Sequence, residues 1–379
     1  MRSPRLTLAL LLLAALPVRA GDPPGKAEGA GPLPSLRDAY RKDFDIGVSL
    51  AGRVPDSLPE PLRALVRTQF AVVTPENCLK MDHVQRTSGT FDFGDADALV
   101  GYATRAGLKV VGHCLVWAKD ERTPAWIFRD GDKPADRDLL LTRMRTHIQT
   151  VVGRYKGRIG SWDVVNEPIA DDGPGDLRPS TWSRVLGDDL LAKSFEYAHE
   201  ADPDAVLILN DYNVELQPAK RERLLRVLGR LRDRGVPIQA VGLQGHFELD
   251  AVPMASLNDT LAALRGMRMK VVISELDLDV IPRSGWWADG GKHRDLLAKL
   301  DPYRDGCPPQ VLKRQADQYA DLFHLLRVNG DVIDRVTFWN LHDGESWLNS
   351  FPWKRVNHPL LFDRAGRPKP AFWAVVGAG

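Results

Sequence analysis

The chain has 379 residues, 44% of them hydrophobic, and its 51 Lys and Arg nearly balance 50 Asp and Glu, for a net charge of +1. This balance gives no electrostatic basis for binding nucleic acid or an anionic membrane surface, so we exclude both and favour a neutral substrate. The hydrophobic content supports a large core, and about 340 residues beyond the N-terminal segment fit one α/β barrel with inserted loops.

The first twenty residues have the pattern of a secretory signal. A charged start is followed by an apolar stretch of about ten residues and by a cleavage site at Val18-Arg19-Ala20. A membrane span needs about 20 apolar residues, so an uncleaved anchor is the weaker alternative. We predict a signal peptide at 1–20, a flexible Gly/Pro-rich lead-in at 21–35 and one folded domain at 36–379. The mature protein is then secreted, to the medium or the periplasm, without a membrane partner.

Eight apolar runs of strand type alternate with stretches of helical spacing, which is the pattern of βα units in a parallel sheet. Continuous apolarity indicates strands buried on both faces, and eight strands are enough to close a barrel. We therefore predict an α/β fold, a single (β/α)8 TIM barrel. The predicted strands are Ile46–Leu50, Ala71–Thr74, Lys109–Trp117, Ser161–Glu167, Val206–Asp211, Ile238–His246, Lys270–Asp277 and Arg335–Leu341.

Helical periodicity fills the intervals between these runs. Leu141, Met144 and Ile148, for example, fall on one face of their segment. Further helices are predicted around residues 99–106 and at Pro61–Phe70, Leu190–Glu200, Pro218–Arg234, Leu257–Met267 and Pro309–Asn329. The longest irregular stretch, 281–308, has a length typical of functional or disordered loops.

Polar and aromatic residues follow almost every predicted strand. In chain order these segments are Thr74-Pro-Glu-Asn-Cys-Leu-Lys80, Gly112-His-Cys-Leu-Val-Trp117, Asn166-Glu167, Asn210-Asp-Tyr-Asn213, Gln244-Gly-His246, Glu275-Leu-Asp277 and Trp339-Asn340 with Trp347. Because active sites of parallel β/α barrels lie at the carboxyl ends of the strands, we expect all of them to converge on one rim. Core packing alone would scatter such residues over both ends.

Two glutamates, Glu167 and Glu275, each directly end an apolar strand. Retaining hydrolysis of a glycosidic bond requires a protonated carboxyl group that assists the leaving sugar and, about 5–5.5 Å away, an ionised one that attacks the anomeric carbon. Crowding of the two groups is expected to raise one pKa and so keep the acid protonated. Either glutamate alone is more often a helix cap or an ion-pair partner, but the shared rim favours chemistry.

Supporting roles are predicted for the neighbouring side chains. Asp277 is expected to orient the imidazole of His246, which hydrogen-bonds the nucleophile, and Asn166 is placed to bond a sugar hydroxyl. Flat faces for stacking pyranose rings are offered by Trp117, Trp339, Trp347 and Tyr212. The structural alternatives are a satisfied buried histidine, tryptophans that only fill the core, and a solvated surface charge at Lys80.

The three cysteines, Cys78, Cys114 and Cys307, form no Cys-x-x-Cys pair, so we predict no zinc site, and no cofactor is expected. Buried free thiols are the expectation. A Cys78–Cys114 disulfide is the alternative that export would permit.

Taken in order, these motifs resemble glycoside hydrolase family 10, the group typified by endo-β-1,4-xylanases, from about Phe44 to Trp373. The resemblance implies a (β/α)8 barrel, retention of anomeric configuration and no catalytic metal or cofactor. It also implies Glu167 as acid/base and Glu275 as nucleophile. The positions that it places along the glycone side of the cleft are Glu76, Asn77, Lys80, His113, Trp117, Asn166, Gln244, His246, Trp339 and Trp347.

One segment departs from this family. After the tryptophan of the third strand the family usually has His-Ser/Asn-Gln, then Pro-x-Trp, whereas here Ala118-Lys-Asp-Glu-Arg-Thr123 precedes Pro124-Ala-Trp126. The missing Gln helps to hold the sugar on the glycone side of the cleaved bond. We expect Arg122 in similar space, which would suit an acidic substituent on the substrate. The loop that carries Trp286-Trp287 either borders the cleft or packs over the barrel rim.

We therefore predict a secreted, monomeric, single-domain retaining endo-β-1,4-xylanase that hydrolyses the xylan backbone by double displacement. Three alternatives stay open: the same chemistry on a decorated xylan, a short oligosaccharide or another β-glycoside; a non-catalytic sugar-binding barrel; and a transglycosylase. A substrate panel with product analysis separates them.

Overall fold

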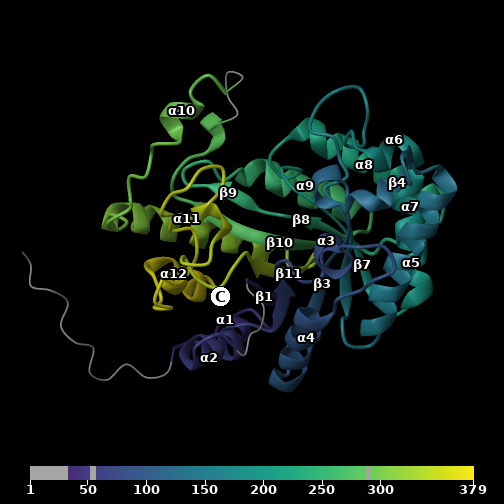
Figure 1. The fold of residues 1–379 in the computed structure, drawn as a ribbon. Helices are drawn as coiled ribbons and strands as arrows, with labels where there is room; N and C mark the ends of the chain where they lie inside the picture. Colours follow the sequence, from purple (N-terminus) through teal and green to yellow (C-terminus); the bar gives the residue numbers. More distant parts are fainter. Residues whose placement is uncertain (1–32, 52–56, 287–290) are drawn as a thin grey trace, which may run out of the picture. The chain divides into compact units, whose positions relative to one another are not determined.

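The structure is a computed structural model that describes residues 33–51, 57–286 and 291–379. The predicted signal peptide and nearly all of the predicted lead-in lie outside the described residues. Residues Ser35–Gly379 form one compact unit, built around a sheet whose strands are surrounded by helices (Figure 1).

The central sheet is a closed barrel of eight parallel strands. Its order is β11-β1-β2-β3-β6-β7-β8-β10, and β10 pairs with β11 to close the ring. The strands are β1 (Asp45–Leu50), β2 (Val72–Pro75), β3 (Lys109–Trp117), β6 (Ser161–Asn166), β7 (Val206–Asp211), β8 (Ala240–Leu243), β10 (Lys270–Asp279) and β11 (Ile333–Phe338). All eight lie within a few residues of the predicted runs, and the predicted (β/α)8 barrel is confirmed.

The sixth strand differs from the prediction, which made it one continuous run from Ile238 to His246. It is divided into β8 and a short strand β9 (His246–Glu248), and each pairs with a different part of β10. Gly245 at the break has φ +76°, and a Cβ there would lie 2.9 Å from Ile273 Cγ2. Only glycine satisfies both constraints, and the break sets the backbone on which Gln244 and His246 reach the rim.

Helices cover the outside of the barrel (Figure 1). The longer ones are α2 (Glu60–Gln69), α4 (Gly94–Ala106), α5 (Arg137–Tyr155), α7 (Asp189–Ala201), α8 (Pro218–Asp233), α9 (Met254–Gly266) and α11 (Pro309–Val328). The shorter ones are α1 (Leu36–Ala39), α3 (Met81–Val84), α6 (Thr181–Leu186), α10 (Arg294–Leu297) and α12 (Pro370–Ala378). An antiparallel pair, β4 (Arg129–Asp130) and β5 (Lys133–Pro134), precedes α5.

Local sequence explains these helices well. In α5, Met144 and Ile148 are fully buried, as their spacing predicts, and Asp136 caps the helix by accepting from Leu139 N–H. In the hydrophobic core, Trp162 on β6 is completely buried beside Gly112 on β3. A Cβ at Gly112 would lie only 1.9 Å from the Trp162 ring, so the glycine makes room for the indole.

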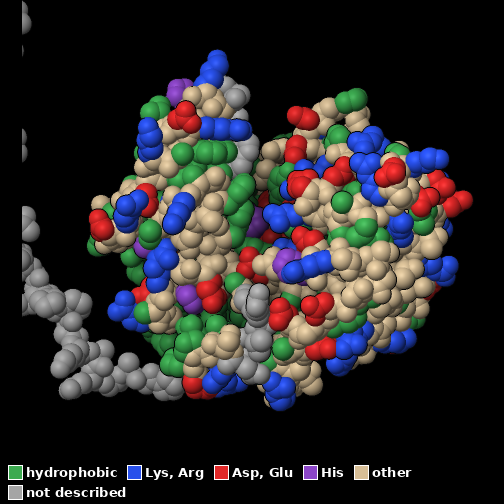
Figure 2. Space-filling view, viewed as in Figure 1, with side chains coloured by type: hydrophobic (Ala, Val, Ile, Leu, Met, Phe, Trp, Pro, Cys, Tyr) green, Lys and Arg blue, Asp and Glu red, His purple; other side chains and the backbone are tan. Residues whose placement is uncertain are grey.

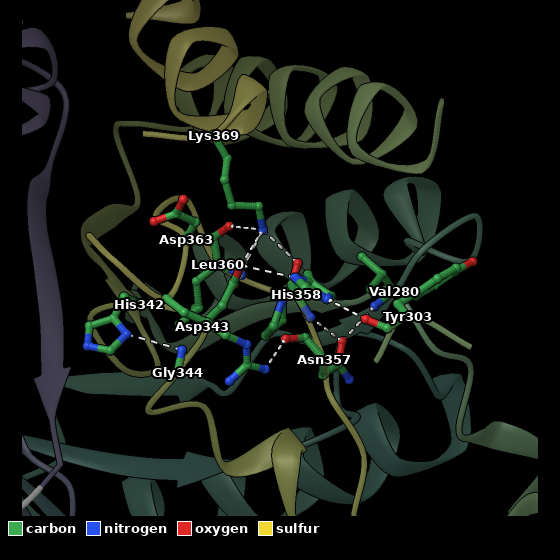
Figure 3. A network of polar contacts seen from close by, with 12 residues as sticks. Val280, Tyr303, His342, Asp343, Gly344, Asn357, His358, Leu360, Asp363 and Lys369 are labelled. Atoms are coloured by element: carbon green, nitrogen blue, oxygen red, sulfur yellow. Dashed lines mark hydrogen bonds and ion pairs between the residues drawn. The ribbon is translucent and has the colours of Figure 1, made fainter. Parts of the chain in front are cut away.

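A buried ion pair attaches the end of the chain to the segment after β11 (Figure 3). Lys369 Nζ lies 3.0 Å from Asp343 Oδ2 and donates to the carbonyl oxygens of His358 and Leu360, each at 2.7 Å. Asp343 also accepts from Leu360 N–H at 2.8 Å. Asp343 is fully buried and Lys369 nearly so, so the closing segment is fixed by charge as well as by packing.

The cysteines are free thiols, with Cys114 buried and Cys78 and Cys307 partly buried, so the alternative of a Cys78–Cys114 disulfide is wrong. Within the described ranges, no group of His, Cys, Asp and Glu side chains is arranged to hold a metal ion. None of the helices in these ranges has the length and apolarity needed to cross a bilayer.

Candidate active site

The predicted site residues lie where the barrel strands end, on one rim. Figure 2 shows a groove on this face, between the part that carries α10 and the part that carries α3, with acidic, basic and histidine side chains gathered along it. Glu167 follows β6 and is 6% exposed, and Glu275 lies on β10 and is 5% exposed. Carboxyl groups buried this deeply must be matched by nearby polar groups.

Glu275 is held by two side chains. Asn210 Nδ2 donates to its Oε1 at 2.8 Å, and His246 Nε2 lies 3.3 Å from its Oε2. The pairing of β10 with β11 shifts register between Ile273 and Leu276, as at a β-bulge. Such an irregularity re-aims a side chain, and here it falls at the glutamate.

Asn210 at the end of β7 contacts both glutamates. Its carbonyl oxygen accepts from Glu167 N–H at 2.7 Å, while its side-chain amide donates to Glu275 and to Asn166 Oδ1, each at 2.8 Å. Ser274 Oγ donates to Asn210 Oδ1 at 2.6 Å and fixes the orientation of the amide. One residue therefore positions the two carboxyl groups relative to a common strand.

His246 has the environment that the sequence predicts. Its Nδ1 lies 3.0 Å from Asp277 Oδ2, and the same carboxylate accepts from Trp347 Nε1 at 2.7 Å. Burial alone would lower the pKa of His246, but Asp277 and Glu275 raise it to about 10. The imidazole is therefore positively charged at neutral pH, and it balances the carboxylate of Glu275.

Glu167 contacts cations that were not predicted as its partners. Lys119 Nζ lies 2.6 Å from its Oε2 and Arg178 Nη2 3.8 Å from the same oxygen, while Gln244 Nε2 donates to Oε1 at 3.2 Å. Arg178 also donates to the Glu167 carbonyl oxygen at 2.8 Å. Glu167 has φ +56°, a conformation that non-glycine residues rarely adopt and that the surrounding contacts must maintain.

The expected raising of this acid's pKa by carboxylate crowding is wrong for the structure as it stands. Burial does raise the pKa of Glu167, but the positive charges of Lys119 and Arg178 outweigh burial and lower it. In this state Glu167 is ionised at neutral pH and forms an ion pair with Lys119.

Three of the residues predicted along the glycone side, Glu76, Asn77 and Lys80, take part in hydrogen-bonded pairs, and together with Asn166 and Gln244 they are called the polar wall. Lys80 Nζ donates to Asn77 Oδ1 at 3.0 Å, and Asn340 Nδ2 donates to Glu76 Oε2 at 2.9 Å. Glu345 is also close: burial, with the charge of Glu76, raises the pKa of Glu345 to about 7.

His113 and Trp339 form a second, deeper contact. The imidazole Nδ1 of His113 lies 2.8 Å from Asp163 Oδ2, and its ring meets the Trp339 ring edge-on, with centroids 5.3 Å apart. His113 is 1% and Trp339 5% exposed. Both side chains are therefore almost fully buried, with little surface available to a ligand.

Two of the predicted stacking rings, Tyr212 and Trp117, have cationic side chains of the protein lying over them. Lys220 Nζ lies 3.5 Å from the centroid of the Tyr212 ring, and the Tyr212 hydroxyl donates to Asp171 at 2.5 Å. The Trp117 ring has three cations near it: Lys80 at 4.9 Å, Arg122 at 5.0 Å and Lys119 at 5.4 Å. The expectation of open apolar faces is therefore wrong for one face of Tyr212, and at Trp117 a sugar would meet charge as well as the ring.

The other two predicted stacking rings, Trp339 and Trp347, differ in exposure. Trp347 is half-buried, packs on Phe351 with centroids 5.0 Å apart and lies beside His246, so it is more accessible than the buried Trp339.

In the long loop after β10, Trp286 stacks on Trp353 with ring centroids 5.2 Å apart, which supports packing over the rim for this part of the loop. Trp287 lies outside the described residues.

Three contacts at the site were not predicted from the sequence: those of Lys119, Arg178 and Asn210. Asn210 belongs to the segment Asn210-Asp-Tyr-Asn213, and its position at a strand end could have indicated that it contacts the two glutamates. Lys119 is two residues beyond Trp117 in the departing segment, in which Arg122 was the residue predicted to reach the substrate. Arg178 lies in the irregular segment between β6 and α6, and no local pattern distinguishes it.

Comparison with known proteins agrees with this geometry. The family model for glycosyl hydrolase family 10 matches residues 35–378. An endo-1,4-beta-xylanase of Geobacillus stearothermophilus is 39% identical over 91% of this chain and 98% of its own length. A beta-1,4-xylanase of Dictyoglomus thermophilum is 34% identical over 98% of both chains.

Solved structures show the same likeness. An endoxylanase from a sugarcane soil metagenome has a TM-score of 0.82 at 37% identity and covers 90% of this chain and 98% of its own. A mutant enzyme in complex with xylotriose has a TM-score of 0.81 at 32% identity, over 91% of this chain and 99% of its own. On these matches, the chain belongs to glycosyl hydrolase family 10.

Proposed function

We propose that this glycoside hydrolase is a retaining endo-β-1,4-xylanase that cleaves the xylan backbone by double displacement. The observation that carries the proposal is the pair Glu167 and Glu275, both buried at the rim and both bonded to Asn210. Family membership and the xylanase names of the relatives support the substrate class.

In the first step, Glu275 attacks the anomeric carbon while Glu167 gives a proton to the departing glycosidic oxygen. His246 and Asn210 hold the Glu275 carboxyl group in position for the attack, and Asp277 holds the imidazole in place. A covalent glycosyl-enzyme forms and the leaving sugar departs with the proton.

In the second step, Glu167 acts as a base. It takes a proton from a water molecule, the oxygen of that water attacks the anomeric carbon, and the bond to Glu275 breaks. The ion pair with Lys119 favours the ionised form of Glu167 that this step uses. The two inversions at carbon together retain the configuration.

The polar wall is proposed to bind sugar hydroxyls on the glycone side. Asn166, Gln244, Lys80 and Glu76 offer both donors and acceptors there, and Trp347 offers a partly exposed ring. No step needs a metal ion or cofactor. We further propose that the chain is exported after removal of residues 1–20 and acts as a monomer. N-terminal sequencing of the secreted protein and its mass in solution test these two points.

The test of the activity is product analysis on unsubstituted xylan, with Glu275→Ala as the inactive comparison. Release of xylo-oligosaccharides that retain the anomeric configuration, lost in the variant, is the expected result. Glu167→Ala should lose activity on xylan but still form the glycosyl-enzyme from aryl glycosides with good leaving groups, which need little acid assistance. A folded Glu275→Ala with full turnover would refute the assignment.

A further inference from the structure

The segment that replaces the family pattern after Trp117 is a built structure. Asp120–Arg122 form one turn of 3-10 helix, closed by Arg122 N–H donating to the Lys119 carbonyl oxygen at 3.1 Å. Asp120 accepts from both the backbone N–H and the hydroxyl of Thr181, each at 2.7 Å. The turn is therefore attached to the start of α6, 61 residues further along the chain.

The following residue fixes the other end of the turn. Thr123 is buried, donates from Oγ1 to the Lys119 carbonyl oxygen at 3.1 Å and accepts from Trp182 Nε1 at 3.0 Å. Because both ends are held, the side chains of Lys119 and Arg122 project from a defined backbone rather than from a loose loop.

The two cations lie on the same ring but have different partners. Lys119 and Arg122 both lie over Trp117, at 5.4 and 5.0 Å from the ring centroid. Lys119 is paired with Glu167, whereas Arg122 is exposed and, within the described ranges, has no carboxylate partner. Basic side chains are visible along the groove in this region in Figure 2.

The Lys119–Glu167 pair opposes the first chemical step. A carboxylate 2.6 Å from an ammonium group holds a proton poorly, yet the first step needs Glu167 protonated. The step would be favoured by a competing anion that draws Lys119 away from Glu167 while substrate is bound. Lys119 has a flexible stem and is 25% exposed, so it can change partner.

We propose that Lys119 and Arg122 together bind the carboxylate of an acidic substituent on the substrate chain, beside the linkage that Glu167 cleaves. This rests on the proposed xylanase function and names its substrate class as xylan that carries uronic acid branches. Both cations lie over Trp117, and Lys119 is paired with Glu167, which places the branch beside the linkage that is cleaved.

Binding of the branch then prepares the acid. The substrate carboxylate pairs with Lys119 and Arg122, Glu167 takes up a proton from solvent, and that proton passes to the departing glycosidic oxygen. The other charged groups around Glu167 are Arg178, Asp211 and, through Asn210, Glu275. These keep their partners, so the exchange is confined to Lys119.

The experiment compares glucuronoxylan with the same polymer after its carboxyl groups have been reduced to alcohols. The wild-type kcat/KM should be roughly tenfold or more higher on the acidic polymer, the worth of one charge-assisted hydrogen bond. Lys119→Gln and Arg122→Gln should each bring the ratio of the two substrates close to one. Lys109→Gln, a change of an exposed lysine at the opposite end of β3, should leave the ratio unchanged.

A second readout separates the proposal from a merely structural role. The alkaline limb of kcat, which reports the enzyme–substrate complex, should lie at higher pH on the acidic polymer than on the reduced one. A wild-type ratio near one, with both polymers cleaved, overturns the proposal and leaves the xylanase function standing. Cleavage of neither polymer, nor of unsubstituted xylan, overturns both.

Discussion

Lys369 is the clearest test of how the closing segment contributes to stability. Its ammonium group has three partners, the Asp343 carboxylate and two carbonyl oxygens, and it is 5% exposed. Lys369→Met keeps the aliphatic stem but leaves a fully buried carboxylate without its cation. Breaking a buried pair in this way costs about 3–5 kcal/mol, a large part of a total stability of about 5–15 kcal/mol.

The assay is urea unfolding followed by tryptophan fluorescence, with the melting temperature as a second measure. A loss of about 3–5 kcal/mol should lower Tm by roughly 5–15 °C in a domain of this size. Lys313→Met is the matched control, because its pair with Asp317 is 75% and 58% exposed and is worth under about 1 kcal/mol.

The double variant Lys369→Met/Asp343→Asn completes the design. Removing the charge at both positions should recover much of the loss, because the cost comes from the unpaired carboxylate. A Lys369→Met variant that loses less than about 1 kcal/mol, or a double variant as unstable as the single one, would refute this reasoning.

Three further predictions concern the rim and the hydrophobic core. Lys119→Gln should move the alkaline limb of kcat/KM on neutral xylan to higher pH, because the pKa of Glu167 loses the cation that lowers it; an unmoved limb contradicts the assigned ion pair. Burial alone would lower the pKa of His246, but its two carboxylate neighbours raise it from 6.5 to about 10. The contribution of the charged imidazole to stability is complete below about pH 6.5 and is lost as pH rises through about 10. The difference in unfolding free energy between wild type and His246→Gln should therefore shrink across that interval. A difference that stays constant in chemical denaturation would argue against the raised pKa of His246. Gly112→Ala should destabilise the barrel by about 1–3 kcal/mol or more, since the added methyl group collides with Trp162; partial rescue by Trp162→Phe is expected, and a fully stable single variant would show that the indole has room to move.

The sequence predicted the barrel well because its strands are buried on both faces. Such strands are continuous apolar runs, and a polar residue at the end of each one is visible without knowledge of the fold. The break in the sixth strand was missed since Gly245 lies inside a run of the right length. Its positive φ and its approach to Ile273 depend on the neighbouring strand.

The candidate site was predictable in its residues and less so in its electrostatics. The contacts of His246 with Asp277 and Glu275 are as expected, because all three lie at strand ends whose direction the barrel fixes. By contrast, the ion pair between Lys119 and Glu167 was not predicted. Which side chain of the segment turns inward is set by the attachment of Asp120 to Thr181, a distant contact that no local spacing encodes.

The position of Asn210 has a consequence for how this rim tolerates change. Both glutamates form a hydrogen bond with this one residue on β7: Glu167 N–H donates to its carbonyl oxygen, and its side-chain amide donates to Glu275. Glu275 takes its contacts from residues on β7 and β9, whereas Glu167 also depends on Lys119 and Arg178, which lie in segments outside the strands. A change in those segments can therefore alter the charge around Glu167 while the contacts of Glu275 are kept.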